Sequence, residues 1–404
     1  MMMTVIIARL FQPALLSVPL MLTAIGSCHE SSGLVGGQVQ ERWYMAQPGY
    51  GRARPAVLDT RVFFGTGDGQ VIARDINSGT QVWSAKTGAD AIDGANLIAR
   101  SGVVVASAIL YTVGIDALSG RELWRYKAPN DTTGVAGGAF LPGTVIDSRL
   151  DADDQLVYIP AWGASISALD LHTGTPRWVW QPGQLAGDTA TSGAFRSGSM
   201  GARVSGDTVF ATLWHYVTRL GGPSEAWVVA LDRSTGKEFW RVRLPYQGSG
   251  VLIEAAPVVY QNLVIVHTLS ARTYAIDRTT QQVVWEFTVP SATLSTIAGP
   301  ELYGDAVYVD GGDQHMYALS ATNGHPRWSA EFETETTRDL LVSANRVTFT
   351  NGGTLYLLDR QTGRRVAAAA QPQTSDSFFA SPALFANGLI FVTVGGAAWC
   401  FDEP

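Results

Sequence analysis

Residues 168–178 read ALDLHTGTPRW, and near-copies of this segment recur along the whole chain. The shared pattern is Ala-x-Asp-x-x-Thr-Gly-x-x-x-Trp, in which Asp170 and Trp178 hold the two most distinctive positions. Successive copies lie 39 to 62 residues apart. A supersecondary unit repeated at such a period is typical of a β-propeller.

The repeated segment occurs seven times with few departures. Its aspartates are Asp75, Asp116, Asp170, Asp232, Asp277 and Asp359, with Ser320 in the sixth copy. Its tryptophans are Trp83, Trp124, Trp178, Trp240, Trp285 and Trp328, with Ala367 in the seventh copy. Gln281 replaces the Gly of the fifth copy.

The chemistry of the pattern is structural. The Asp and Thr side chains can bind backbone groups of a tight turn, and the Gly supplies a positive φ. The Trp lies four residues beyond the Gly, where it can fill the wedge between neighbouring blades if its N–H finds a partner. Carbohydrate or cofactor binding by these tryptophans is the alternative, but their regular position favours blade docking.

Runs of β-branched and aromatic residues, bounded by turn residues, precede the pattern in each repeat. Examples are residues 262–267, 305–310 and 387–393. Such runs are typical of strands. The sequence therefore predicts an all-β fold in which each repeat is a four-stranded antiparallel blade, with strands A to D running from the inside out.

The two ends of the chain predict how the ring closes. Residues 398–402 resemble a strand C that stops at Asp402, and residues 41–43 resemble a strand D that carries Trp43. Joining the two completes one blade and removes the free sheet edges that invite aggregation. We therefore expect an eight-bladed propeller over residues 41–404, with the last blade closed by the N-terminal strand.

Composition excludes several classes of function. Hydrophobic residues make up 46% of the chain, charged residues only 16%, and Gly occurs 43 times, which suits a turn-rich β protein. The net charge of −7 and the lack of a basic cluster argue against nucleic-acid binding. The two cysteines lie at opposite ends, and no Cys/His spacing indicates zinc.

Two acidic clusters could suggest a metal ion. One comprises Asp310, Asp313 and His315, and the other Asp151, Asp153 and Asp154. Neither follows the twelve-residue calcium loop with its Gly and terminal Glu, and hydrated turns are the favoured reading. The sequence also contains neither a Gly-x-Ser-x-Gly elbow nor a phosphate-binding loop. We assign no catalytic, cofactor-binding or metal-binding residue.

The first 27 residues predict a secretory signal peptide. An apolar stretch at 15–22 is too short to span a membrane stably, and small residues follow it. Cys28 comes directly after Gly26 and Ser27, as in the lipobox of bacterial lipoproteins, so we expect Cys28 to carry a lipid. Ordinary cleavage with an incidental Cys28 is the alternative. Residues 28–40 are polar and Gly-rich, as in a tether.

The repeat resembles that of the pyrroloquinoline-quinone (PQQ) family of β-propellers over about residues 41–402. One branch, the quinoprotein dehydrogenases, binds PQQ and calcium in the propeller channel. A second, the BamB-like lipoproteins of outer-membrane β-barrel assembly, keeps the repeat without the cofactor. Dehydrogenases are typically longer and have a disulfide between adjacent cysteines, which this chain lacks. The resemblance is nearest to the BamB-like branch and implies a place in the bacterial cell envelope, in the periplasm or at the outer membrane.

Insertions interrupt the period at about residues 127–143, 181–198 and 215–225, which all map to one face around blades three and four. Long loops on a rigid scaffold concentrate binding residues, and Arg and aromatic side chains dominate hot spots. The candidates for a contact surface are Arg196, Arg203, Trp214, His215, Tyr216 and Arg219. Ordinary decorated loops are the equal alternative.

The sequence favours a monomeric, lipid-anchored scaffold that binds proteins at the membrane, in line with outer-membrane assembly, and uses no cofactor. The alternative is a quinoprotein-like oxidoreductase, or another ligand-binding propeller, whose central channel holds PQQ with calcium or a sugar.

Overall fold

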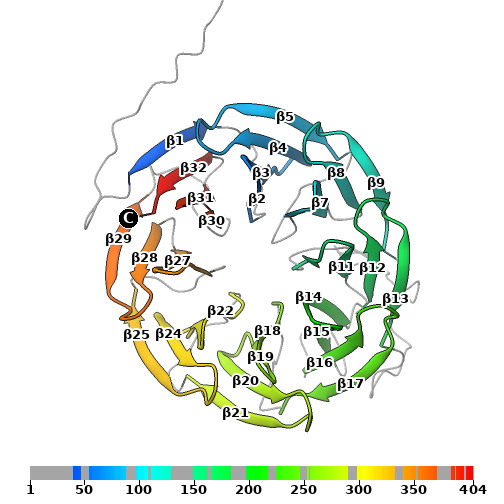
Figure 1. The fold of residues 1–404 in the computed structure, drawn as a ribbon. Helices are drawn as coiled ribbons and strands as arrows, with labels where there is room; N and C mark the ends of the chain where they lie inside the picture. The colour runs from blue at the N-terminus through cyan, green and yellow to red at the C-terminus, as the bar shows by residue number, and fades with distance from the viewer. Residues whose placement is uncertain are drawn as a thin grey trace, which may run out of the picture. The chain divides into compact units, whose positions relative to one another are not determined.

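Figure 1 shows the computed structural model of the chain. It describes residues 40–46, 54–87, 97–107, 111–128, 149–161, 165–182, 197–216, 224–245, 253, 255–289, 298–332, 340–351, 354–370, 384–386, 388–394 and 397–403. The chain divides into two units, Met1–Ser32 and Gly33–Pro404, and every described residue lies in the second. Across these ranges no helix is long and apolar enough to cross a membrane.

The described strands form eight four-stranded antiparallel sheets, which stand as blades around a ring (Figure 1). Written from the innermost strand outward, blade 1 is β2 (Ala56–Leu58), β3 (Arg61–Gly65), β4 (Gln70–Asp75) and β5 (Gln81–Lys86); blade 2 is β6 (Leu97–Arg100), β7 (Val103–Ser107), β8 (Thr112–Asp116) and β9 (Glu122–Tyr126); blade 3 is β10 (Asp151–Ala152), β11 (Leu156–Pro160), β12 (Ile166–Asp170) and β13 (Pro176–Trp180); blade 4 is β14 (Ser197–Ser205), β15 (Thr208–Tyr216), β16 (Ser224–Asp232) and β17 (Glu238–Arg243).

The second half of the ring repeats this order. Blade 5 is β18 (Val258–Tyr260), β19 (Leu263–His267), β20 (Arg272–Asp277) and β21 (Val283–Thr288); blade 6 is β22 (Glu301–Tyr303), β23 (Ala306–Asp310), β24 (His315–Ser320) and β25 (Pro326–Glu331); blade 7 is β26 (Leu340–Val342), β27 (Arg346–Asn351), β28 (Thr354–Asp359) and β29 (Arg365–Ala370); blade 8 is β30 (Leu384–Ala386), β31 (Leu389–Val394), β32 (Ala397–Asp402) and β1 (Glu41–Ala46).

Blade 8 joins the two ends of the chain. Strand β1 pairs antiparallel with β32, so that Trp43 lies opposite Cys400. The Asp402 N–H donates to the Gln40 carbonyl at 2.9 Å, and an ion pair of 2.8 Å links Arg42 to Asp402. The predicted eight-bladed all-β propeller, closed by the N-terminal strand, is therefore confirmed.

Antiparallel strands give the ring two faces. The turns between the first and second strands of each blade, and those between the third and fourth, lie on one face, which we call the turn face. The strand ends at which the chain leaves the second strand for the third, or one blade for the next, lie on the other face, which we call the loop face. The repeated Asp-x-x-Thr-Gly segment belongs to the turn face.

The motif turn of blade 4 shows how the repeated residues work. The Asp232 carboxylate accepts hydrogen bonds from the Ser234 and Thr235 backbones at 3.0 and 2.8 Å, and from their hydroxyls at 2.7 and 2.8 Å. The Ser234 and Thr235 hydroxyls lower the pKa of Asp232 to about 2. Gly236 ends the turn with a φ of 70°, a value that a side chain rarely tolerates.

Trp178 of blade 3 lies against this turn. Its indole N–H donates to the Arg233 carbonyl of blade 4 at 2.9 Å. A Cβ added to Gly236 would lie 2.6 Å from the Trp178 ring, so the ring needs a glycine beneath it. Five further tryptophans donate across a blade interface to the residue that follows the motif Asp or its Ser320 equivalent: Trp43 to Ile76, Trp83 to Ala117, Trp124 to Leu171, Trp285 to Ala321 and Trp328 to Arg360.

Each motif tryptophan also covers a small residue of its own blade. In blade 3 this partner is Ala168, which lies opposite Trp178 in the ladder. The equivalent residues are Ala73, Gly114, Ala230, Ala275, Ala318 and Cys400. A Cβ on Gly114 would lie 2.1 Å from the Trp124 ring. Except at Trp240, where the next blade has Gln281, the indole therefore lies between a small residue of its own blade and a glycine of the next blade.

The structure predicts different effects of alanine at two glycines with a positive φ. Gly120 and Gly102 have φ values of 76° and 81°, but a Cβ on Gly120 would meet Trp83 at 2.8 Å, whereas one on Gly102 meets nothing within 4 Å. Gly102→Ala should lower the free energy of unfolding by about 1 kcal/mol through backbone strain alone. Gly120→Ala should cost about 1–3 kcal/mol more because the indole must move.

Thermal and urea unfolding of both variants measure this difference. Equal losses of stability in the two proteins would show that the indole contact does not explain the glycine.

Candidate functional site

The predicted contact residues are spread over blade 4 and its flanks. Arg196 and Arg219 lie outside the described residues, as does Cys28. His215 and Tyr216 end strand β15 at the loop face, where only their backbone is described. Trp214 is only 3% exposed, so its ring belongs to the interior of the blade. Arg203 pairs with Phe210 near the opposite, turn-face end of the same hairpin.

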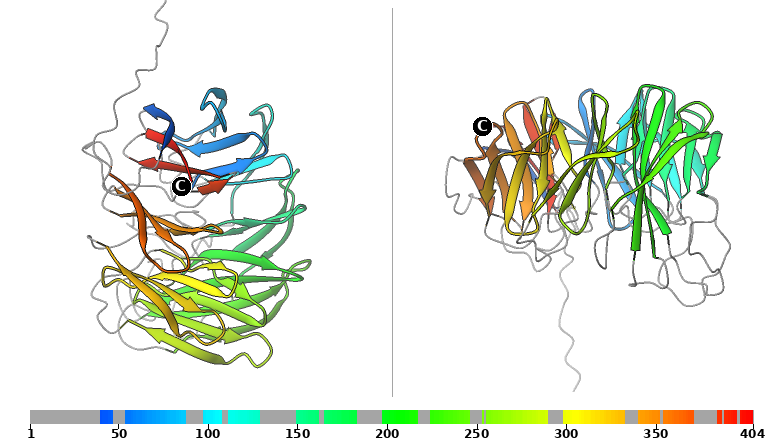
Figure 2. Two further views of the ribbon diagram at one scale, coloured as in Figure 1. Left: turned by 60° about the vertical axis from the view of Figure 1, so that its left-hand side comes forward. Right: turned by 90° about the horizontal axis from the view of Figure 1, so that it is seen from below.

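Blade 4 is the longest blade of the described chain. Strands β14, β15 and β16 have nine residues each, whereas strands in the other blades have two to six. In the right-hand view of Figure 2, the green strands of this blade reach beyond those of their neighbours. Their projecting part is firmly anchored, because Leu213 and Trp227 pack with Trp180 of blade 3 in one buried cluster. The β15–β16 hairpin of blade 4 is therefore a rigid element at the loop face.

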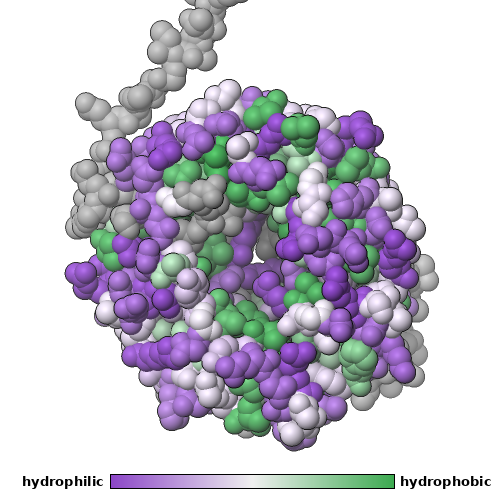
Figure 3. All heavy atoms as spheres, viewed as in Figure 1, coloured by the Kyte–Doolittle hydropathy of each residue, from purple (hydrophilic) through white to green (hydrophobic). Residues whose placement is uncertain are grey.

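A cluster of charged side chains lies across the ring axis. Arg54, Arg149 and Glu301 stand at the starts of the innermost strands of blades 1, 3 and 6. The Glu301 carboxylate accepts hydrogen bonds from Arg54 at 3.1 Å and from Arg149 at 3.3 Å. These blades are not neighbours, so the side chains meet over the central hollow, whose edge is partly hydrophilic in Figure 3. No sequence signal pointed to this cluster, because none of its members belongs to the repeat.

This cluster tests whether the channel suits PQQ with calcium. Calcium takes six to eight oxygen ligands. The Glu301 carboxylate is bound by two guanidinium groups, whose positive charge opposes a cation beside it. Among the described residues no three His, Cys, Asp or Glu side chains are grouped to hold a metal. The described residues of the channel therefore do not fit PQQ held with calcium.

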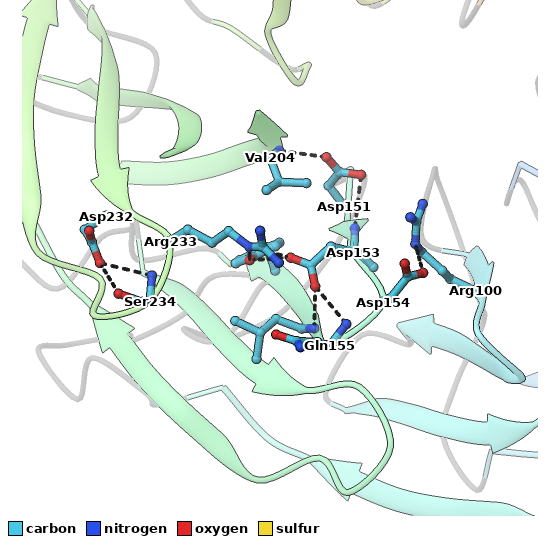
Figure 4. Close-up of polar contacts among 12 residues, drawn as sticks. Arg100, Asp151, Asp153, Asp154, Gln155, Val204, Asp232, Arg233 and Ser234 are labelled. Atoms are coloured by element: carbon cyan, nitrogen blue, oxygen red, sulfur yellow. Dashed lines mark hydrogen bonds and ion pairs between the residues drawn. The ribbon is translucent and has the colours of Figure 1, made fainter. Parts of the chain in front are cut away.

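The acidic turn at Asp151, Asp153 and Asp154 divides its carboxylates among three partners (Figure 4). Asp151 accepts a backbone N–H of strand β14 at 2.8 Å, and burial raises the pKa of its carboxyl. Asp153 pairs with Arg233 of blade 4 at 2.8 Å, while Asp154 pairs with Arg100 of blade 2 at 2.9 Å. The turn therefore links blades 2, 3 and 4 on the turn face.

The cluster at Asp310, Asp313 and His315 is also satisfied locally. Asp310 accepts the Gly312 N–H at 2.9 Å. Asp313 accepts the Tyr317 hydroxyl at 2.8 Å and the His315 N–H at 3.2 Å. Burial and the hydrogen bond to Asp313 raise the pKa of Tyr317. These contacts shape the tip of a hairpin.

A buried histidine joins blades 5 and 6 at the loop face. His267 is 2% exposed, and its Nδ1 lies 2.9 Å from the Thr273 hydroxyl. Burial lowers the pKa of His267 to about 4, although a hydrogen bond with the Asp310 backbone partly opposes this shift. The imidazole is therefore neutral in the folded protein at pH 7.

Comparison with known proteins assigns the fold to a family. The family model described as outer membrane protein assembly factor BamB, a PQQ-repeat family, matches residues 38–212 and 224–402. The chain belongs to this family. Residues 213–223, which the two matches leave out, begin near the end of strand β15 and stop just before strand β16.

Individual relatives extend this result. The outer membrane protein assembly factor BamB of Yersinia pestis is 24% identical over 377 residues, which cover 88% of this chain and 85% of that protein. The crystal structure of BamB from Moraxella catarrhalis matches with a TM-score of 0.56 at 17% identity, over 87% of this chain and 85% of that one. Quinohemoprotein alcohol dehydrogenase from Comamonas testosteroni gives a TM-score of 0.67 at 14% identity, over 90% and 76%. At these identities the two solved structures share the fold alone.

His267 predicts a loss of stability in mild acid. Both states are neutral above pH 6.5, but below it the unfolded chain binds a proton first, so the free energy of unfolding falls between pH 6.5 and about 4. The difference between these pKa values corresponds to about 3 kcal/mol. His267→Gln should flatten this part of the profile.

Urea unfolding at a series of pH values measures the effect, with the exposed His172→Gln as the control. The motif aspartates such as Asp232 act in a separate window: their folded-state pKa is lowered, so their stabilisation is lost only below about pH 4. An unchanged slope between pH 6.5 and 4 in His267→Gln would contradict the assignment.

Substitution of Glu301 tests how strongly its cluster with Arg54 and Arg149 stabilises the ring. Glu301→Gln leaves two guanidinium groups facing each other, which should lower the free energy of unfolding by about 2–3 kcal/mol. The control is Asp305→Asn, which breaks an exposed pair with Arg327 and should change stability little. Thermal unfolding at low and high salt distinguishes the two, and an equally small effect of both substitutions would exclude a role for the cluster.

Proposed function

We propose that this protein is an exported, lipid-anchored scaffold that binds other proteins during outer-membrane protein assembly. The observation that carries the proposal is the family match, which spans both halves of the propeller. The relative from Yersinia pestis, named as an assembly factor, aligns over 85% of its own length, so the likeness extends beyond a single repeat. The proposed setting is the bacterial cell envelope.

The geometry supports a binding role on the loop face of blades 3 and 4. There the nine-residue strands of blade 4 extend beyond those of the neighbouring blades, and the cluster around Trp227 anchors the β15–β16 hairpin. A rigid mount lowers the entropy that loops lose when they bind. We propose Cys28 as the lipid-bearing residue and residues 28–40 as the tether that holds the propeller near its partners.

The second candidate, a PQQ-dependent oxidoreductase, is favoured by the fold that the chain shares with quinohemoprotein alcohol dehydrogenase and by partial sequence similarity to a quinoprotein ethanol dehydrogenase. The engagement of Glu301 by Arg54 and Arg149 opposes it. Incubation with PQQ and calcium separates the two functions. A PQQ absorbance that stays with the protein through desalting, together with dye-linked alcohol oxidation, would favour the enzyme over the scaffold.

Charge reversal on the loop face tests the scaffold directly. Arg196→Glu combined with Arg219→Glu should weaken binding to purified β-barrel assembly components from the same source at least tenfold, because a repelled contact replaces an attractive one. The matched control is Lys237→Glu, an exposed position in the motif turn of the same blade on the opposite face. Its binding should be unchanged.

Surface plasmon resonance measures these affinities. If the wild-type chain binds no assembly component, the proposed function is wrong. If it binds and the double variant binds equally well, only the choice of face is wrong.

A further inference from the structure

At one of the eight blade interfaces the outermost strand carries no motif tryptophan. The outermost strand of seven blades carries a tryptophan that faces the next blade, whereas strand β29 of blade 7 carries Ala367 at that position. We call the interface between blades 7 and 8 the seam. It lies beside the blade in which the two chain ends meet.

The residues aligned with Ala367 in the inner strands of blade 7 also differ from their counterparts in blade 6. In blade 6 the ladder aligns Tyr308, Ala318 and Trp328, and in blade 7 it aligns Thr348, Leu357 and Ala367 at the equivalent positions. Phe349 and its alternate neighbours pack toward blade 6, so the Thr348 row faces blade 8. Leu357 recovers only a small part of the apolar area that an indole would bury, because it adds three carbons where nine heavy atoms are lost.

An indole in strand β29 would also have no glycine turn on the next blade to pack against. Six of the motif tryptophans pack on a motif glycine of the next blade and donate to the carbonyl after the motif Asp or its Ser320 equivalent, as Trp328 does with Gly363 and Arg360. In blade 8 no turn joins strand β32 to β1, because the two strands come from opposite ends of the chain, and Gln40 directly precedes β1. The missing tryptophan and the missing glycine turn therefore belong to the same interface.

The seam combines apolar and polar side chains. Blade 8 presents Trp399 and Phe401 to it, because Phe391 and Cys400 pack toward blade 1. Thr348 and Thr350 are 0% and 4% exposed, and their hydroxyls have no hydrogen-bond partner among the described residues. A buried hydroxyl without a partner is destabilising. On the turn face the Ser343 hydroxyl donates to the Glu403 carboxylate across the seam at 2.6 Å.

We propose that the propeller ring opens at the seam, where blade 8 separates from blade 7 before any other pair of blades. Blade 8 stays with blade 1, because Trp43 donates to Ile76 at 3.2 Å and packs on Gly79. Opening within blade 8 instead would break the β1–β32 ladder and the Arg42–Asp402 ion pair. Separation at the seam removes no strand from its sheet.

Labelling of buried thiols tests the proposal. In a Cys28→Ser background the native Cys400 is 0% exposed at the interface between blades 8 and 1. Thr348→Cys places a thiol in the seam one strand nearer the ring axis than Cys400, and Val105→Cys places one at the matching position of the interface between blades 2 and 3, where Val105 is also 0% exposed. Under native conditions a disulfide reagent should label Thr348→Cys at least tenfold faster than Cys400 or Val105→Cys. If Thr348→Cys does not fold, Thr350→Cys takes its place.

Two engineered disulfides supply a matched control. Ser343→Cys with Glu403→Cys clamps the seam, and Ser101→Cys with Asp154→Cys clamps the interface of blades 2 and 3 at a similar serine–carboxylate contact. The two clamps close chain segments of similar length, so their effects on the unfolded chain are nearly equal. The seam clamp should abolish fast labelling at position 348, and the other clamp should leave it unchanged. Equal labelling of all three thiols, or no effect of the seam clamp, would overturn the proposal.

Discussion

The contact on which the propeller depends is the indole that spans two blades. Trp178 covers Ala168 of its own blade, packs on Gly236 of the next and donates to the Arg233 carbonyl. Each part is weak alone, since one such hydrogen bond contributes about 1 kcal/mol. Repetition around the ring makes the sum large, and the geometry fixes the spacing between blades. The motif turn exists to present the glycine and the carbonyl in the right place, and the Asp232 carboxylate holds that turn in shape.

The same contact explains the departures from the repeat. Ala367 lies where strand β29 faces a blade without a motif turn. The tryptophan and the glycine turn on which it would pack are therefore absent from the same interface. Gln281 holds a φ of 59° in place of a glycine, so the turn geometry persists even where a side chain opposes it. Ring closure relies on the β1–β32 ladder, which recreates a fourth strand from the other end of the chain.

The fold was predictable because the repeat encodes it at every level. The spacing of the motif predicted the blades, and the positions of Trp43 and Asp402 predicted that the N-terminal strand completes the last blade. The role of the Ala in the pattern was missed, since only the ladder shows that a small residue must lie beneath the indole. The axial cluster was missed because Arg54, Arg149 and Glu301 are far apart in sequence and meet only across the ring. A spacing argument likewise cannot tell that Trp214 faces the interior, because both faces of a blade strand are buried.

The polar groups that resemble a reactive site in sequence hold the ring together instead. Asp153 and Asp154 pair with Arg233 and Arg100 across two blade interfaces, and His267 is held neutral between blades 5 and 6. The proposed contact with a partner lies on the loop face, where the strands of blade 4 project (Figure 2). In Figure 1 blade 4 and the seam stand on opposite sides of the ring. A partner bound at blade 4 would therefore contact a part of the ring in which both neighbouring blade interfaces contain a motif tryptophan. Opening at the seam would leave the loop face of blade 4 unchanged.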